Sequence, residues 1–245
     1  MAGHSHWSKI KRAKGANDAM RGKIWSKIAR KIIIAAKAGG GNPAENLSLR
    51  YVIDEAKAVN MPRDTIEKAI KKGTGELGAE NYEPAVYEAY APGGVAIMID
   101  ALTNNRSRTA PDLRAVLERA GGNLAQSGAV AFQFTKCGVI TIKSDAIAED
   151  DLMEKALEFG ADDVKNQGEV FEVITSPVTF QKVREGLVNA KVPIEAGEVT
   201  YLPNNTVNIN VDAAQKLLKL VDALEDNEDV QSVSHNAEIP DSVTT

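Results

Sequence analysis

The chain has 245 residues, of which 43% are hydrophobic and 26% charged, so its size allows one large domain or two to three small ones. No uninterrupted apolar run approaches the roughly 20 residues that a membrane-spanning helix needs, and we expect no membrane contact. The single cysteine, Cys137, excludes an internal disulfide and any multi-cysteine metal site, and with the lack of a secretory signal it favours the reducing cytoplasm.

Charge is distributed unevenly along the chain, although the formal total is only −5. Residues 1–72 contain 16 Lys/Arg and 6 Asp/Glu, a net charge of +10, whereas residues 73–245 carry a net charge of −15. Ten of the basic residues lie within the first 37 positions, against one acid, Asp18. Because like charges repel and a polyanion relieves that repulsion, this segment predicts a nucleic-acid partner.

The N-terminal part predicts a basic arm followed by three helices. Residues 1–19 have no sustained apolar period, but from Met20 apolar residues recur every three or four positions, as in an amphipathic helix. Residues 39–41 are glycines that end this helix; they lack the Lys-Ser/Thr of a phosphate-binding loop. A second helix centred on residues 49–56 and a third over residues 63–72 complete a small bundle. The stripe of the first helix is formed by Met20, Ile24, Ile28, Ile32 and Ala35.

Strand periods begin after a glycine-rich linker at residues 73–81. Residues 82–90 and 95–102 flank a Pro-Gly-Gly turn and predict a β-hairpin. A polar loop over 103–108 then leads to a helix that Thr109 is expected to cap, and residues 129–134 are predicted as the next strand.

Residues 139–202 have the order βαββαβ of a ferredoxin-like unit. Its predicted elements are strand 139–142, helix 149–159, strands 162–164 and 170–174, helix 177–190 and strand 194–202. Ser176 is expected to cap the second of these helices. Strand 206–211, helix 212–224 capped by Asp212 and strand 230–235 follow, and they complete a layer with residues 82–134. The acidic tip at 225–229 and the tail after Pro240 are expected to be solvated surface.

The predicted fold class is therefore α+β, a three-domain protein with an N-terminal helical bundle and two α+β domains, one ferredoxin-like and inserted into the other. The expected limits are 1–76 for the basic arm and three-helix domain, 82–134 plus 204–238 for the discontinuous domain, and 135–203 for the inserted domain.

Several motifs in order along the chain resemble the YebC family, which is described as bacterial transcriptional regulators with a mitochondrial branch that activates translation of a cytochrome oxidase subunit. The resemblance implies three domains and a cytoplasmic nucleic-acid-binding protein. Ala91 and Asn104 stand where the family pattern has Gly and Asp. The motifs are Ala2-Gly3-His4-Ser5 with Trp7, Ile10-Lys11, Gly39-Gly40, Asn60-Met61-Pro62, Pro92-Gly93-Gly94-Val95, Leu102-Thr103-Asn104-Asn105-Arg106 with Arg108-Thr109, and Gly121-Gly122-Asn123-Leu124.

The arm and the first helix supply most of the expected nucleic-acid contacts. Their cations would neutralise phosphates without reading sequence, so affinity should fall steeply with salt. Trp7 is the better candidate for stacking on an unpaired base, because Trp25 lies beside the apolar stripe, where core packing is the alternative. Solubility and helix formation alone remain the alternative for the cations. The expected residues are Trp7, Lys9, Lys11, Arg12, Lys14, Arg21, Lys23, Lys27, Arg30 and Lys31.

Arg106 and Arg108, on the predicted loop before a helix, are further phosphate-binding candidates, with Asn104 and Asn105 supplying amides. The alternative is a plain turn with solvated arginines.

No catalytic residue, metal site or cofactor is predicted, and we expect no enzymatic activity. The histidines His4, His6 and His235 match no catalytic or zinc motif; chelation of Cu(II) or Ni(II) by the start of the chain would require Met1 to be removed. The acidic residues match no acid/base motif, and Cys137 is expected to be a small buried residue.

The leading functional hypothesis is a non-enzymatic regulator of gene expression that binds DNA. The first alternative is a ribosome-associated translation factor that binds ribosomal RNA, where splayed bases would suit Trp7. The second is a ligand-sensing or enzymatic α+β protein, which would need a pocket of convergent polar groups that the sequence does not indicate. No small-molecule substrate is predicted.

Overall fold

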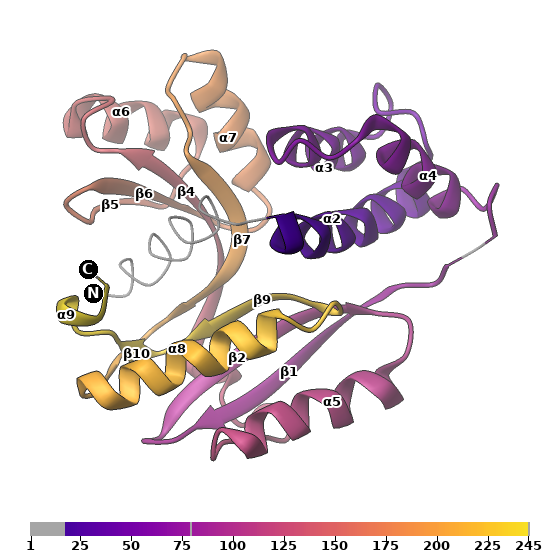
Figure 1. Cartoon of the computed structure of the whole chain (residues 1–245). Helices are drawn as coiled ribbons and strands as arrows, with labels where there is room; N and C mark the ends of the chain where they lie inside the picture. The colour runs from indigo at the N-terminus through magenta and orange to yellow at the C-terminus, as the bar shows by residue number, and fades with distance from the viewer. Residues whose placement is uncertain (1–17, 79, 245) are drawn as a thin grey trace.

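The computed structural model describes the backbone of residues 18–78 and 80–244, and the side chains of residues 22–78, 80–240, 242 and 243. It is an α+β protein of three domains (Figure 1). The helical N-terminal domain lies beside a ferredoxin-like domain, and both lie over a second α+β domain formed by segments from two distant parts of the sequence.

The N-terminal domain contains α2 (Asp18–Gly39), α3 (Leu47–Ala58) and α4 (Arg63–Gly73), which confirms the predicted helices in its described residues. Ile28, Ile32 and Leu49 are buried in its core. Asn46 joins two of the helices: its side-chain oxygen accepts from the Leu49 backbone N–H at 3.0 Å, and its amide donates to the carbonyl of Ala35 at 2.8 Å. The sharp reversal after α2 is therefore held by a buried cap.

The discontinuous domain has an antiparallel sheet in the order β3-β1-β2-β9. The predicted hairpin is confirmed as β1 (Glu83–Ala91) and β2 (Val95–Thr103), and its turn uses Gly93 and Gly94 at positive φ. Helices α5 (Arg106–Arg119) and α8 (Val211–Glu225) supply Leu113 and Leu220 to a core under one face of the sheet. The other strands are β3 (Asn123–Leu124) and β9 (Val230–His235).

The inserted domain has the strand order β5-β6-β4-β7 with antiparallel neighbours, the arrangement of a ferredoxin-like βαββαβ unit. Its helices α6 and α7 cover one face and bury Leu152 and Leu187 against Ile140 and Val173 of the sheet. Its elements are β4 (Phe134–Lys143), α6 (Glu149–Phe159), β5 (Asp163–Asn166), β6 (Val170–Thr175), α7 (Phe180–Asn189) and β7 (Ala196–Pro203).

Two predicted strands are wrong. Residues 129–130 form a bend, residues 131–133 form the short 3₁₀ helix η1 (Ala131–Gln133), and β4 begins only at Phe134. Val130 and Phe134 are buried against Ala96 and Met98 of β2. The alternation of apolar residues in this segment therefore comes from a loop packed on the sheet and not from a strand. The predicted strand over 206–211 shrinks to β8 (Val207–Asn208), which pairs in parallel with β10 (Ala237–Glu238).

Three predicted helix starts also change. Asn210 caps α8 in place of Asp212, and Asn105 caps α5 in place of Thr109; each side chain accepts from the backbone N–H three residues ahead. Helix α7 begins at Phe180, because the Ser176 hydroxyl accepts from Thr179 N–H and closes a turn there first. The tail after Pro240, expected to be solvated, includes the short helix α9 (Asp241–Thr244).

Candidate nucleic-acid interface

Helix α2 carries the basic row, which we define as Lys23, Lys27, Arg30 and Lys31. The apolar side of the helix packs into the bundle: Ile24 is partly buried, and Ile28 and Ile32 are fully buried, as predicted. The basic row spans about two turns of the helix; Lys23 is exposed, Lys27 and Lys31 are partly buried, and Arg30 is buried.

The acidic loop, residues 225–229 between α8 and β9, lies against the basic row. Lys23 Nζ is 2.7 Å from Asp226 Oδ1, and Arg30 Nη2 is 3.0 Å from Glu228 Oε2. The expected solvation of this loop holds for the side chains of Asp226 and Glu228, which are 64% and 67% exposed, but it is wrong for Asp229, which is 3% exposed. The loop is thus a docking surface for the N-terminal domain.

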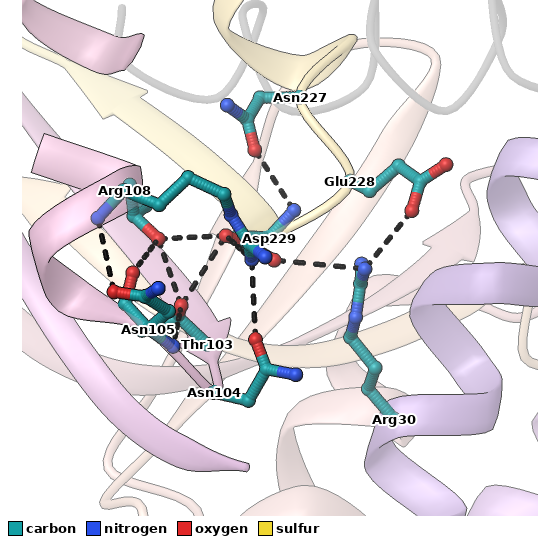
Figure 2. A network of polar contacts seen from close by, with 9 residues as sticks. Arg30, Thr103, Asn104, Asn105, Arg108, Asn227, Glu228 and Asp229 are labelled. Atoms are coloured by element: carbon teal, nitrogen blue, oxygen red, sulfur yellow. Dashed lines mark hydrogen bonds and ion pairs between the residues drawn. The ribbon is translucent and has the colours of Figure 1, made fainter. Parts of the chain in front are cut away.

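Asp229 is the centre of a polar network that joins two domains (Figure 2). Its Oδ2 accepts from Thr109 Oγ1 at 2.6 Å and from Arg108 Nη2 at 2.7 Å, and its Oδ1 lies 3.5 Å from Arg30 Nη2. Thr103 Oγ1 also donates to Oδ2, at 3.2 Å. Two cations that lie 78 positions apart in the sequence therefore meet at one buried carboxylate.

Electrostatics and burial act in opposite directions in this network. Burial alone would raise the pKa of Asp229, but the hydrogen bonds from Thr109 and Arg108 and the charges of Arg108 and Arg30 lower it below its ordinary value. The pKa of Lys27 is lowered because its amine is buried, despite the nearby charges of Glu225 and Asp226. The lowered pKa of Asp229 keeps its carboxylate ionised at neutral pH.

Arg106 and Arg108 lie in the first turn of α5, so their predicted position on a loop is wrong. Arg106 Nε pairs with Glu83 Oε1 at 2.5 Å, and its Nη2 donates to the carbonyl of Pro84 at 3.0 Å. Arg108 also donates to Asn104 Oδ1 at 3.2 Å, so this asparagine contacts Arg108 through its side-chain oxygen. Both arginines are held by protein acceptors.

A solvent-open cavity of about 280 Å³ lies between the acidic loop and helices α2 and α5. Both charge signs are present in its wall, so it offers no single-sign site for an anion or a cation. It is lined by Arg30, Arg108, Asp112, Asn227, Glu228 and Asp229.

The remaining predicted contacts fall partly outside the described residues. Lys31 Nζ pairs with Glu55 Oε1 at 2.8 Å within the bundle. Arg21 lies on α2, but its side chain is not described. Trp7, Lys9, Lys11, Arg12 and Lys14 lie outside the described residues, and their role stays a prediction.

The other candidates have structural uses or remain undescribed. Trp25 donates its Nε1–H to the carbonyl of Val59 at 3.2 Å and packs on the bundle core, so its core-packing alternative is the one observed. Cys137 is buried, and burial raises the pKa of its thiol. His4 lies outside the described residues. In the part of the chain that the structure describes, no group of three His, Cys, Asp or Glu side chains is placed to hold a metal.

Within residues 18–78 and 80–244, no helix combines the length and the apolarity needed to cross a bilayer.

Sequence reasoning missed Asp229, Thr103 and Thr109, which link the site together. A weak signal was present for Asp229: it is the last acid of its run and directly precedes the apolar start of a strand, Val230. Its burial depends on tertiary contacts with Thr109, Arg108 and Arg30, which lie far away in the sequence.

The fold and this interface define a class: a three-domain α+β protein whose basic helical domain is docked by ion pairs on an acidic body. Residues 5–76 match the family model described as the TACO1/YebC protein N-terminal domain, and residues 82–237 match the one described as the TACO1/YebC second and third domain. The chain belongs to this TACO1/YebC family, which confirms the resemblance of its motifs.

Relatives match over nearly the full length. Proteins of Syntrophobacter fumaroxidans and Natranaerobius thermophilus, each named "probable transcriptional regulatory protein", are 49% and 48% identical; in both cases 99% of this chain and 98% of the relative are covered. A crystal structure of a conserved hypothetical protein from Aquifex aeolicus is similar with a TM-score of 0.82 and 47% identity, covering 91% of this chain and 93% of that one.

Proposed function

We propose that this protein is a non-enzymatic, cytoplasmic regulator of gene expression that binds nucleic acid through its N-terminal domain, with DNA as the first candidate. The observation that carries the proposal is the charge asymmetry: a net +10 over residues 1–72 attached to a body of net −15. A separated basic module concentrates the electrostatic attraction for a polyanion on one domain, because the charge of the body has the opposite sign. The names of the relatives support a role in transcription.

The basic row would bind phosphates at a competitive cost. Lys23 and Arg30 already pair with the acidic loop, so a nucleic acid would have to displace that loop or bind beside it. The exposed Lys23–Asp226 pair is worth about 0–1 kcal/mol, which a polyanion with several phosphates can exceed. The acidic loop would thereby favour long polyanions over single small anions.

A binding titration against salt tests the proposal. Labelled duplex DNA and structured ribosomal RNA fragments are titrated with the protein at a series of salt concentrations. We expect affinity to fall with a log–log slope of about −0.9 per neutralised phosphate for duplex DNA. The variant with Lys9, Lys11, Arg12 and Lys14 changed to Glu should bind more weakly with a flatter slope. Binding that ignores both salt and these charges would refute the proposal.

An experiment in cells is needed to distinguish DNA from ribosomal RNA as the bound nucleic acid. Crosslinking, followed by sequencing of the bound DNA and RNA, separates promoter DNA from ribosomal RNA. Enrichment of ribosomal RNA, with co-sedimentation on ribosomal particles, would replace transcription by translation as the regulated step.

A further inference from the structure

The loop before β4 exposes an aromatic ring. Phe132 in η1 is 75% exposed, and among the residues whose exposure the structure describes it is the only exposed aromatic. Its neighbours Val130 and Phe134 are buried against the β1–β2 sheet. The segment is therefore anchored on both sides of Phe132, while the ring itself points away from the core. A ring that stays exposed on an anchored segment is suited to meet a partner.

A buried carboxylate holds this loop in shape. Glu88 of β1, itself buried, accepts the backbone N–H groups of Gly128 at 2.6 Å, Val130 at 2.6 Å and Ala131 at 2.9 Å. Burial would raise the pKa of Glu88, but these three backbone hydrogen bonds lower it, so the carboxylate stays ionised. Such charge-assisted bonds are among the stronger ones in proteins.

Other contacts brace the same loop from neighbouring elements. The Tyr90 hydroxyl donates to the carbonyl of Ala129 at 3.0 Å. Asn204, in the turn after β7, donates its side-chain amide to the carbonyl of Phe132 at 3.3 Å and accepts from Thr135 Oγ1 at 2.6 Å. The position of Phe132 is therefore fixed before any partner arrives, which lowers the entropic cost of binding.

The two loop segments beside the ring contain polar residues but no charged ones. Residues 125–135 and 199–210 contain no charged side chain, although the body around them carries a large negative charge. The polar side chains of these loops carry neutral amide and hydroxyl groups. The exposed residues of the two connected loops are Gln126, Ser127, Gly128, Phe132, Thr135, Asn204, Asn205 and Thr206.

We propose that Phe132 is a stacking platform for an unpaired base of a single-stranded nucleic acid, with the amides of the adjacent loops available to its edge. An aromatic side chain stacks on a base irrespective of sequence, and neutral amides hydrogen-bond to base edges. A protein partner would instead favour an apolar surround for the ring, which this surface lacks. The inference rests on the proposed function and adds a second contact point, on the body rather than on the basic domain.

The test compares Phe132→Ala, Phe132→Tyr and the wild type by fluorescence anisotropy. The probes are single-stranded RNA, single-stranded DNA and duplex DNA of one sequence at fixed salt. We expect Phe132→Ala to weaken single-strand binding about tenfold and to leave duplex binding unchanged, while Phe132→Tyr, which keeps a stacking ring, stays near the wild type. Val178→Ala removes an apolar side chain that is 90% exposed near α7, and it serves as the matched control.

Each outcome decides the matter. Unchanged single-strand affinity in Phe132→Ala, or equal losses on single strands and duplex, would overturn the stacking inference and leave the proposed function standing. Release of a co-purifying protein by Phe132→Ala, with RNA and DNA affinity intact, would overturn it in favour of a protein partner. A wild-type protein that binds none of the probes would overturn the proposed function, and the inference with it. A larger effect on RNA than on DNA would support the inference and identify the strand type.

Discussion

At the scale of single residues, Asp229 makes the contacts whose loss should destabilise the interface most. Asp229→Asn removes the charge that Arg108 and Arg30 share; Arg108 loses its carboxylate partner, and the buried Arg30 keeps only Glu228. Breaking a buried pair by removing one partner costs about 3 kcal/mol or more, so we expect a loss of that order in the free energy of unfolding. Urea titration measures it. Asp226→Asn, whose pair with Lys23 is exposed, should cost less than about 1 kcal/mol; equal costs would contradict the central role of Asp229.

The same carboxylate predicts a pH dependence. Because the folded-state pKa of Asp229 is lowered, its stabilising contribution is present above the unfolded-state pKa, about 3.9, and is lost as the pH falls through the folded-state pKa. The difference in unfolding free energy between the wild type and Asp229→Asn should therefore be largest near neutral pH and shrink below about pH 4. Unfolding titrations over that range check it; a constant difference would show that the charge is not the cause.

Residue roles were only partly predictable because the sequence shows charge but not partners. Arg30 and Arg108 were expected to face phosphate, and the structure places both on one internal carboxylate. Their partner Asp229 belongs to an acid run, which usually indicates solvent. Contacts with Thr109 and Arg108 of its own domain and with Arg30 of the helical domain make it a buried residue instead.

At the scale of elements, the basic row of α2 and the acidic loop are bound to each other by charge. We expect that neutralising the loop with Asp226→Asn and Glu228→Gln frees Lys23, leaves Arg30 paired with Asp229 alone, and raises the affinity for duplex DNA about threefold, since the exposed Lys23 pair is worth less than about 1 kcal/mol. Filter binding at low salt measures the change.

The control for this double variant must add the same net charge elsewhere. Glu154→Gln with Glu158→Gln does so on the exposed side of α6. If both double variants bind DNA equally more tightly, the effect is one of total charge, and the acidic loop has no specific role.

Elements with strong local patterns were predictable, and those set by tertiary contacts were not. The helix over 149–159 and the strand over 230–235 have the predicted limits, because apolar period and turn residues mark both ends. Residues 129–133 alternate in the same way but form a loop, since Val130 and Phe134 are buried against the β1–β2 sheet and Glu88 accepts the backbone N–H groups that a strand would use. The capping residues were predicted wrongly because several polar residues precede each helix, and the sequence does not show which of them caps it.

At the scale of the whole molecule, polar contacts attach the helical domain to the other two. Arg50 Nη2 lies 3.2 Å from Glu185 Oε1 of α7, the Tyr51 hydroxyl donates to the same carboxylate, and Lys23 and Arg30 pair with the acidic loop. No hydrophobic cluster of the described residues combines side chains of α2, α3 or α4 with those of α7 or α8. Each domain thus has its own core, and charge decides how the first one sits on the others.

Salt should therefore loosen the arrangement of domains without unfolding them. The screening length falls from about 10 Å at 0.1 M to about 3 Å at 1 M salt, which weakens exposed pairs far more than the three buried cores. We expect the radius of gyration from small-angle scattering to rise over this range while far-ultraviolet circular dichroism stays constant. Glu185→Ala combined with Glu228→Gln should show the expanded form already at low salt, because it removes one docking contact on each side of the helical domain. A scattering curve that is the same at both salt concentrations and in this variant would mean that contacts other than these ion pairs hold the domains, and that a nucleic acid would meet the basic row only in its docked position.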